Sequence, residues 1–376
     1  MKIAMLGTKG IPAKWGGIEK YIEEISVRLA AMGHEVTVFG SKWYCRDYHH
    51  RVYKSVNVVQ LPSMHMQATD ALSNGALATL FSMGHRFDVA NFHGYASYFY
   101  LPFFKMMNIK TVVTPHGVES GWDNPKYGSV GRTILKKAFA LGIRNADAVV
   151  TVAMHLKQNI EDNFGVGAEV IYSGLDAGQK MGNSIIKKKY GLNGGDYVFF
   201  IGRIDPIKRV HWLTELSQRL PAEVKMVVSG GAQDKATEKY LKQLKVACLK
   251  NEGIIFTGPV AGEEKVQLLN NCICVLVPSK YEGLPITLLE AASYGRSCIA
   301  SSIPAHDEVI ENGVNGFLFP NGDKNAFIDM TLNLLNNDPG LMGQAGRQAK
   351  EMAKQKFDWD KTSLMYERLF RRLVDV

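Results

Sequence analysis

The chain has 376 residues, of which 46% are hydrophobic and 21% are charged. This length suits two domains of ordinary size, and the composition is that of a globular protein rather than a disordered or fibrous one. The net charge of +8 is shared evenly between residues 1–178 and 179–376, so neither half is a dedicated basic module. No apolar run approaches the ~20 residues of a membrane-spanning helix. The apolar start at residues 1–7 is too short for a signal peptide, and we therefore expect a cytoplasmic protein.

The cysteines lack the spacing of a zinc site, and a cytoplasmic chain does not favour disulfides. We expect all of them to be core residues that bind no metal. They are Cys45, Cys248, Cys272, Cys274 and Cys298.

The first half alternates apolar runs with segments of helical periodicity, which predicts a parallel sheet covered by helices. A strand over residues 3–7 leads through a glycine-rich loop into a helix over 18–32 that ends at Gly33. Further strands are predicted at 35–39, 56–61, 88–92, 111–115, 148–152 and 169–172.

Residues 173–195 break this alternation, because they combine many glycines with a basic run at 187–189. We therefore expect an N-terminal Rossmann-like domain at 1–178, a linker at 179–195 and a C-terminal Rossmann-like domain at 196–356. Two doubly wound domains of this kind place ligands at the carboxyl ends of their strands, here where the domains face each other across a cleft. The second half is predicted to have strands at 197–201, 225–229, 254–256, 272–277 and 297–300, a turn at 311–319, and closing helices.

The loop after the first strand carries Gly16 and Gly17 at the start of the first helix. It lacks the G-x-G-x-x-G spacing of a dinucleotide site, and no acidic residue ends the second strand. Glycines at a helix start let backbone N–H groups approach a phosphate or an acceptor. A flexible turn without a ligand is the alternative.

Basic and aromatic side chains alternate between residues 42 and 54, which suits an anionic membrane surface or an anionic acceptor. The same side chains could bind single-stranded nucleic acid. A solvated loop with a few packed aromatic residues explains the pattern equally well. The candidates for an acceptor or membrane face are Lys42, Trp43, Tyr44, Arg46, Arg51 and Lys54.

A phosphate site is predicted after the first strand of the second half, where Gly202 is followed by Arg203 and Lys208. The planar guanidinium and the ammonium can bind one diphosphate together, the first as a fork and the second as a point charge. Their position directly after a buried strand favours this interpretation over a chance pair of surface cations.

Residues 278–290 carry the strongest signal, because Glu282 lies in a turn and Glu290 lies about two turns into the helix that follows. Pro285 suits the first position of this helix and Gly295 suits its end. Unpaired N–H groups at the helix start favour an anion. Free amides and two carboxylates can bind phosphate and sugar hydroxyls together, as a sugar-nucleotide site requires. The donor-binding candidates here are Gly283, Leu284, Pro285, Ile286, Thr287 and Glu290.

This segment resembles the E-x7-E signature of retaining glycosyltransferases with the GT-B fold, above all those of glycosyltransferase family 4. The flanking Pro-Ser, the Glu-Gly-Leu-Pro core and the continuation Glu-Ala-Ala-Ser-Tyr-Gly all match. The resemblance implies that Glu290 binds the ribose hydroxyls and that Glu282 contacts the transferred sugar. It further implies that Arg203 and Lys208 neutralise the leaving diphosphate. We expect no metal and no cofactor, because these cations and the helix N-terminus supply positive charge.

The first half is similar to a subgroup of family 4 that includes bacterial rhamnosyltransferases and related polysaccharide enzymes. The matching stretches include Gly-Thr-Lys-Gly-Ile-Pro at 7–12, Gly-Gly-Ile-Glu at 16–19 and Thr-Pro-His-Gly at 114–117. The resemblance implies that His116 lines the donor-sugar side, with a structural histidine as the alternative; His93 and Asp123 are weaker candidates. It also implies that a last helix within 357–376 crosses back to the first domain.

The sequence thus predicts a retaining glycosyltransferase that moves a sugar from a UDP-, GDP- or dTDP-linked donor to a saccharide or lipid-linked acceptor. The resemblance points to bacterial cell-surface polysaccharide or lipopolysaccharide (O-antigen) assembly, with peripheral contact at the inner face of the plasma membrane and no nucleic-acid partner. A sugar-nucleotide epimerase and an inactive sugar-nucleotide-binding subunit remain as alternatives. A glycosidase is disfavoured because its carboxylates lie within ~5–9.5 Å, whereas eight helical positions span ~12 Å.

Overall fold

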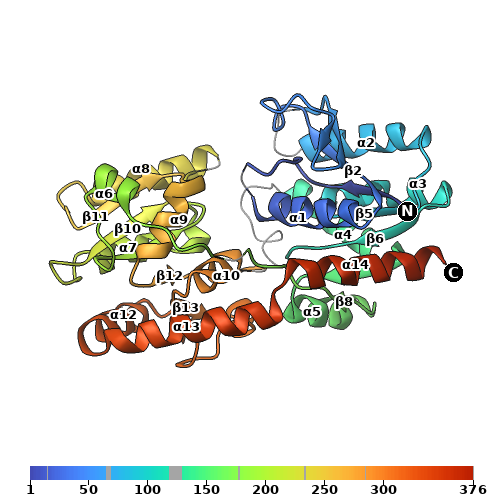
Figure 1. Cartoon of the computed structure of the whole chain (residues 1–376). Helices are drawn as coiled ribbons and strands as arrows, with labels where there is room; N and C mark the ends of the chain where they lie inside the picture. The colour runs from blue at the N-terminus through green and yellow to red at the C-terminus, as the bar shows by residue number, and fades with distance from the viewer. Residues whose placement is uncertain are drawn as a thin grey trace. The chain divides into compact units, whose positions relative to one another are not determined.

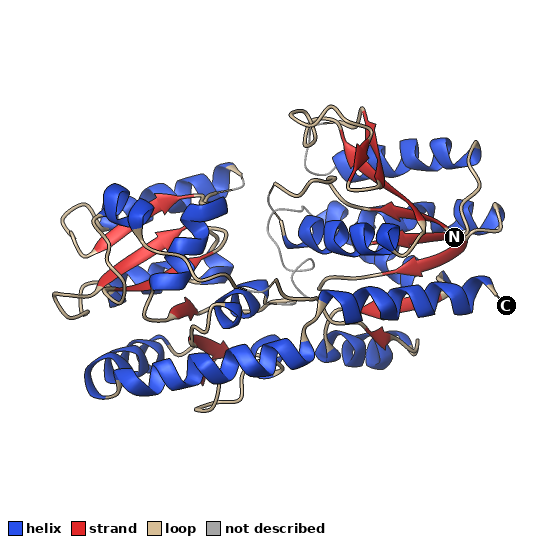
Figure 2. Cartoon of the chain, viewed as in Figure 1, coloured by secondary structure: helices blue, strands red, loops and turns tan. Residues whose placement is uncertain are grey.

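A computed structural model describes residues 1–14, 16–64, 69–117, 129–176, 178–232, 234–283 and 285–375. The chain forms two compact units: Met1–Gly174 with Phe357–Val376, and Leu175–Lys356. Each unit contains a sheet with helices packed against it, as Figures 1 and 2 show. Among the described residues, no helix combines the length and the hydropathy of a membrane span.

The first unit contains an eight-stranded sheet in the order β3-β4-β2-β1-β5-β6-β7-β8. All neighbours are parallel except β3 and β4, which form an antiparallel pair at the edge. In central β1 the residues from Ile3 to Leu6 are fully buried, as expected for a strand covered on both faces. The strands are β1 (Lys2–Leu6), β2 (Glu35–Ser41), β3 (Val52–Tyr53), β4 (Val56–Leu61), β5 (Val89–Phe92), β6 (Lys110–Val113), β7 (Ala148–Thr151) and β8 (Glu169–Val170).

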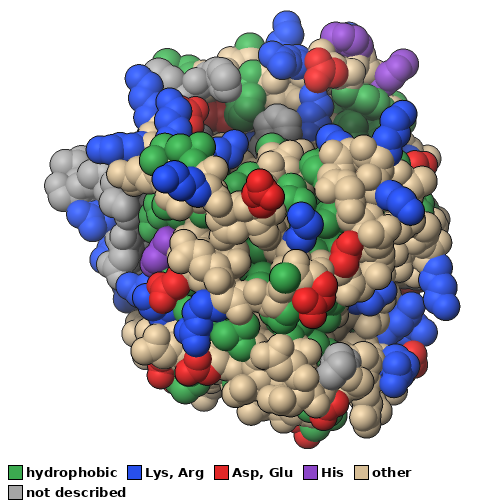
Figure 3. Space-filling view, turned by 90° about the vertical axis from the view of Figure 1, so that its left-hand side faces the viewer, with side chains coloured by type: hydrophobic (Ala, Val, Ile, Leu, Met, Phe, Trp, Pro, Cys, Tyr) green, Lys and Arg blue, Asp and Glu red, His purple; other side chains and the backbone are tan. Residues whose placement is uncertain are grey.

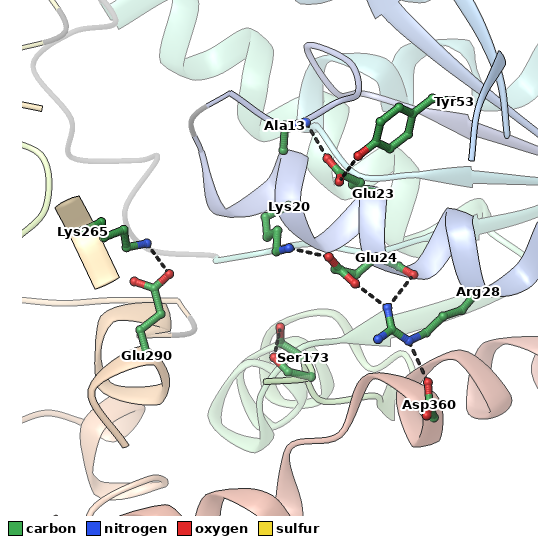
Figure 4. A network of polar contacts seen from close by, with 11 residues as sticks. Ala13, Lys20, Glu23, Glu24, Arg28, Tyr53, Ser173, Lys265, Glu290 and Asp360 are labelled. Carbon is green, nitrogen blue, oxygen red and sulfur yellow. Dashed lines mark hydrogen bonds and ion pairs between the residues drawn. The ribbon is translucent and has the colours of Figure 1, made fainter. Parts of the chain in front are cut away.

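The helices of the first unit include the last helix of the chain, α14, which packs against α1. Its Tyr366 hydroxyl is buried and lies 3.1 Å from both the Tyr21 hydroxyl of α1 and Thr114 Oγ1 after β6. Arg28 Nε of α1 also donates to Asp360 Oδ1 at 2.8 Å (Figure 4). The helices are α1 (Gly17–Ala31), α2 (Thr69–Met83), the 3-10 helix η1 (Tyr95–Tyr100), α3 (Leu101–Met106), α4 (Ser129–Asn145), α5 (Met154–Phe164) and α14 (Trp359–Val374).

The second unit contains a six-stranded parallel sheet in the order β11-β10-β9-β12-β13-β14. Successive residues of β9 point to opposite faces, so Val198 and Phe200 belong to one buried cluster, and Tyr197 and Phe199 to the other. The strands are β9 (Tyr197–Ile201), β10 (Lys225–Ser229), β11 (Ile254–Gly258), β12 (Val275–Val277), β13 (Cys298–Ser302) and β14 (Phe317–Pro320).

Helices on both faces of this sheet bury the two apolar clusters. They are α6 (Ser184–Tyr190), the 3-10 helix η2 (Pro206–Lys208), α7 (Val210–Leu216), α8 (Lys235–Ala247), α9 (Gly262–Asn271), α10 (Ile286–Ser293), α11 (Pro304–Asp307), α12 (Lys324–Asn337) and α13 (Pro339–Lys356).

Two segments differ from the sequence-based expectation. Residues 179–195, expected as a linker, contain α6 and belong to the second unit, because Ile186 and Leu192 are fully buried in its core. Gly191 has a φ of +68° and ends α6. Residues 311–319, expected as a turn, run into β14, which pairs with β13. The core cysteines are all unpaired and buried, as predicted.

In each sheet the chain order reverses beside a central strand: between β1 and β5 in the first unit, and between β9 and β12 in the second. Ligands of doubly wound proteins bind at the carboxyl ends of the strands at such a point. The loops that follow these strands therefore contain the candidate site. Elsewhere the surface is mixed: on the face in Figure 3, apolar side chains lie in small areas between basic and acidic ones.

Candidate active site

The loop after β9 carries the predicted phosphate-binding pair, but the two cations differ in their surroundings. Asp205 Oδ1 accepts a hydrogen bond from Ile207 N at 2.9 Å and caps η2, which ends at Lys208. The Lys208 side chain is only 15% exposed. The Arg203 side chain is 45% exposed and lies 4.0 Å from Asp205. Arg203 therefore extends into solvent from the same loop, free to move toward a ligand.

Gly202 lies at the start of this loop, and its N–H already donates to Ser229 O at 3.1 Å. Its carbonyl lies so close to Gly230 that a Cβ there would be 1.8 Å away. Gly202 thus serves a close backbone approach between β9 and β10, and its place in a donor site stays a prediction.

Glu282, in the turn after β12, forms an ion pair with Lys208. Its Oε1 accepts from both Lys208 Nζ and Ser279 Oγ, the latter at 2.8 Å. The carboxylate is 14% exposed. Burial would raise its pKa, but the Lys208 ammonium and these hydrogen bonds outweigh burial and hold the pKa below its ordinary value. Glu282 is therefore ionised at neutral pH, and the structure joins two residues that the sequence assigned to sugar and diphosphate.

A chain of buried polar groups supports Glu282 from beneath. Ser279 follows β12, and Ser301 lies near the end of β13. Both are fully buried, and Ser301 Oγ donates to Ser279 O. The imidazole of His306 on α11 is also fully buried, and its Nδ1–H donates to Ser301 O at 2.7 Å. Burial lowers the pKa of His306, with Lys208 acting in the same direction and Glu282 opposing it. The imidazole is therefore neutral at neutral pH.

The helix α10 begins one residue later than predicted, at Ile286, with Pro285 as its N-cap. Its first-turn N–H groups, those of Ile286 and Thr287, have no acceptor within the helix and point from its N-terminus. Thr287 Oγ1 donates to Ile201 O at 3.4 Å, which ties the helix start to the end of β9. Gly295, with a φ of +70°, follows the helix end as predicted. Gly283 lies in the preceding turn, and Leu284 is outside the described residues.

Glu290 lies on α10 and has its own cation, Lys265 of α9. Lys265 Nζ donates to Glu290 Oε1 at 2.5 Å, and the two side chains are about equally exposed, at 30% and 31% (Figure 4). The two glutamates of the E-x7-E segment are thus each matched to a lysine from a different element.

In the first unit, the glycine-rich loop is held in place by side chains of α1. Gly16 has a φ of +103° and packs against Glu19, so a Cβ there would lie 2.0 Å from Glu19 Oε2. Glu23 Oε2 accepts from Ala13 N at 2.5 Å, and its Oε1 accepts from the Tyr53 hydroxyl at 2.9 Å (Figure 4). Helix α1 then begins at Gly17. The loop is therefore anchored at several points rather than a flexible turn.

His116 lies after β6 at the carboxyl end of its sheet and is partly buried. Its Nε2 lies 3.1 Å from His93 Nδ1, and the ring meets Tyr21 edge-on at a centroid distance of 4.9 Å. Burial lowers the pKa of His116 to about 3, so it is neutral at neutral pH. It can offer a hydrogen bond to a sugar, but it cannot supply a positive charge. His93 is fully buried, and Asp123 lies outside the described residues.

The stretch from 42 to 54 separates into packed aromatic and exposed basic side chains. Tyr44 is 1% exposed, and its hydroxyl accepts from Lys14 N at 2.8 Å. Trp43 is partly buried and donates from Nε1 to Asp70 Oδ1 at 3.0 Å. Both side chains are held in the unit by hydrogen bonds, and the burial of Tyr44 contradicts its expected contact with a membrane interface; for partly buried Trp43 that contact stays a prediction. The exposed cations, called the basic loop below, are Lys42, Arg46, Arg51 and Lys54.

Within the described ranges, no group of three or more His, Cys, Asp or Glu residues has the arrangement of a metal site. Asp358-Trp359-Asp360 has the Asp-x-Asp spacing by which some transferases bind a divalent ion. Here Asp358 caps α14 by accepting from Asp360 N and Lys361 N, and Asp360 pairs with Arg28. These carboxylates therefore have structural partners.

Sequence reasoning missed the residues that support the two glutamates, namely Lys265, Ser279, Ser301 and His306. A serine at the end of each of two neighbouring parallel strands was the available signal, because such side chains meet at one edge of a sheet. The roles of Lys265 and His306 depend on contacts between elements that no local pattern specifies.

Two family models match consecutive parts of the chain. Residues 15–179 match the model described as Glycosyltransferase Family 4, and residues 183–355 match that described as Glycosyl transferases group 1. The chain therefore belongs to the glycosyltransferases. Its two α/β units are the Rossmann-like domains of the GT-B fold, the class that the E-x7-E segment had indicated.

Among curated relatives, an uncharacterised glycosyltransferase of Methanocaldococcus jannaschii is 26% identical, over 63% of this chain and 63% of that protein. The chain thus matches a little under two thirds of that relative's length. The glycogen synthase of Mycobacterium tuberculosis is 24% identical, over 96% of this chain and 92% of that protein.

Solved structures agree on the fold. The sucrose-phosphate synthase of Thermosynechococcus elongatus superposes with a TM-score of 0.85 at 19% identity, covering 100% of this chain and 99% of that one. HepE of Anabaena, solved in complex with UDP-glucose, has a TM-score of 0.80 at 20% identity, covering 99% and 100% of the two chains.

Proposed function

We propose that the protein is a retaining glycosyltransferase that moves a sugar from a nucleoside-diphosphate donor to a saccharide or lipid-linked acceptor. The Lys208–Glu282 pair carries this proposal, because it joins a cation and a carboxylate at the ends of β9 and β12 beside the start of α10. These are the groups that a diphosphate and a sugar need next to each other. The UDP-glucose complex of the similar Anabaena protein supports the donor class.

In the proposed reaction the chain acts mainly through fixed charge. Lys208, Arg203 moving in from solvent, and the first amides of α10 stabilise the charge that grows on the leaving diphosphate. Glu282 contacts the transferred sugar. Glu290 binds the ribose hydroxyls, with its carboxylate bonded both to Lys265 and to the nucleotide. His116 in the first unit donates or accepts one hydrogen bond to the sugar as a neutral imidazole.

The acceptor and the location belong to the same proposal. The first unit would bind the acceptor, and the exposed cations of the basic loop would meet an anionic membrane surface. We therefore place the protein in the cytoplasm, in peripheral contact with the inner face of the plasma membrane, in cell-surface polysaccharide or lipopolysaccharide assembly.

A donor panel tests the proposal. Purified protein is incubated with UDP-, GDP- and dTDP-linked sugars, and both the shift in Tm and the slow release of nucleoside diphosphate are measured. We expect one donor to raise Tm and to release its nucleotide; proton NMR of the product with an acceptor then gives the anomeric configuration. Glu282→Gln should abolish release, whereas Glu311→Gln, at an exposed position of the same unit, should not.

Three outcomes contradict parts of the proposal. Conversion of the free donor into an epimer without acceptor would identify an epimerase. A Tm shift with no release under any condition would indicate a binding subunit. The absence of a Tm shift with every donor would refute the proposal that the protein has a sugar-nucleotide site.

A further inference from the structure

A continuous line of hydrogen-bonded polar groups connects the largely buried Lys208 to the core of the second unit. Lys208 bonds Glu282, Glu282 accepts from Ser279, Ser279 O accepts from Ser301, and Ser301 O accepts from His306 Nδ1–H. His306 is 0% exposed, and its Nε2 has no hydrogen-bond partner among the described residues. A buried nitrogen without a hydrogen-bond partner destabilises the fold, and such an atom therefore calls for an explanation.

The Lys208–Glu282 pair cannot persist unchanged when a donor binds. The proposed function gives Lys208 to the diphosphate, which carries two negative charges and lies at the same loop. Glu282 would then keep its charge in a largely buried place with Ser279 as its remaining hydrogen-bond donor. A buried carboxylate without a counter-charge is strongly unfavourable.

His306 is connected to Glu282 through Ser279 and Ser301, and a positive charge on its imidazole would lower the pKa of Glu282, as the Lys208 ammonium does. We propose that His306 takes up a proton at Nε2 when a nucleoside-diphosphate sugar draws Lys208 away from Glu282, and so becomes the new counter-charge of that carboxylate. The proton comes from solvent, and His306 changes from neutral imidazole to imidazolium while Glu282 stays ionised. This inference rests on the proposed function, because it requires the donor's diphosphate at Lys208.

The charges facing His306 set the direction of this change. In the free protein, burial and Lys208 lower the pKa of His306, whereas Glu282 and Asp307 raise it. Moving Lys208 away and adding an anionic diphosphate both favour the charged imidazole. Its Nδ1–H keeps its bond to Ser301 O in both states, so only Nε2 changes its protonation. Donor binding should therefore tighten as the pH falls through the range in which His306 of the complex takes up its proton.

Isothermal titration calorimetry measures the proton directly. UDP-glucose, GDP-glucose and dTDP-glucose are titrated into the protein at pH 7 in buffers of low and high protonation enthalpy. Both phosphates of these donors are diesters that do not titrate near neutral pH, so any proton taken up belongs to the protein. We expect the donor that binds to be accompanied by uptake of a substantial fraction of one proton.

Three variants show which residue takes up the proton. His306→Asn keeps a donor to Ser301 O but has no titrating group, so uptake should disappear and affinity at pH 6 should fall by roughly tenfold, as for one lost charge-assisted contact. Glu282→Gln removes the need for a counter-charge, and it should also abolish uptake. His85→Asn, at an exposed position of the first unit, should behave as the parent.

The outcomes separate this inference from the proposed function. A donor that binds without proton uptake, or with equal uptake in His306→Asn, overturns the role of His306 while leaving the glycosyltransferase intact. Binding of no nucleotide sugar, neither these three nor any other member of the donor panel described above, overturns both. Near-parental Tm values for the variants exclude loss of folding as the cause.

Discussion

Replacing Lys208 by methionine should destabilise the second unit far more than a surface lysine would. The side chains of Lys208 and Glu282 are 15% and 14% exposed, so the change leaves a largely buried carboxylate with Ser279 as its only assigned hydrogen-bond donor in the described chain. Removing one partner of such a pair costs about 3 kcal/mol. For a unit of this size, that lowers the Tm of its transition by about 6–12 °C.

The dependence of this loss on pH follows from the sign of the pKa shift. The pKa of Glu282 is lowered in the folded protein, so the pair stabilises the fold above the ordinary carboxyl pKa and ceases to do so as the pH falls through the lowered value. In Lys208→Met the ammonium, the largest influence that lowers this pKa, is lost, so the pKa rises relative to the parent. The deficit should therefore be largest at neutral pH and should shrink as the pH falls toward the ordinary carboxyl pKa of about 4, because the buried carboxyl of the variant then becomes protonated and neutral.

Urea unfolding of the full chain at pH 7 and pH 4, followed by tryptophan fluorescence, measures this effect. Lys208→Met/Glu282→Gln should recover most of the loss, because replacing both partners removes the uncompensated charge. Lys324→Met, which breaks the exposed Lys324–Glu215 pair, should change stability by less than about 1 kcal/mol. A Lys208→Met protein as stable as the parent at pH 7, or a double variant no better than the single one, would refute the reasoning.

Other consequences of the site are testable in turnover and binding assays. Arg203→Ala or Lys208→Ala should lower turnover by on the order of 10²–10³, and near-normal rates in both would exclude them from the site. Glu290→Gln should weaken donor binding with a smaller effect on turnover at saturating donor; an unchanged KM would contradict ribose binding there. Activity should survive EDTA, and loss that magnesium or manganese reverses would show that the cations do not suffice. Co-sedimentation with anionic vesicles at low and high salt should fall when the basic loop is changed to glutamate, and equal sedimentation would exclude that face.

The sequence predicted the two α/β units because their strands are continuous apolar runs, a pattern typical of parallel strands covered on both faces. It also predicted that Glu282, Arg203 and Lys208 lie near one sheet edge, since each follows a buried strand. It did not predict that Lys208 forms an ion pair with Glu282 in the absence of a phosphate. That contact depends on how the loops after β9 and β12 approach each other. The two loops are joined by a hydrogen bond from Lys280 N to Ile207 O at 2.8 Å.

Local composition gave wrong predictions for segments whose structure depends on packing against other elements. Glycines suggested a free linker at 179–195, but Ile186 and Leu192 supply enough apolar surface to bind that segment to the second unit. Aromatic side chains beside lysines suggested a membrane face, but Tyr44 is buried by the glycine-rich loop it supports. Arg209 occupies a left-handed position, with a φ of +51°, a conformation that favours glycine or asparagine. Its guanidinium lies 4.6 Å above the Trp212 ring, a contact that helps to offset the strain.

The return of α14 to the first unit has a consequence for biosynthesis. Tyr366 completes a buried group with Tyr21 and Thr114, yet the ribosome makes it only after the entire second unit. At ~5–20 residues per second, residues 1–174 wait ~10–40 s with that surface open. The second unit, being continuous in sequence, can fold as soon as it emerges. The half of the protein that is synthesised first is therefore the half that finishes folding last.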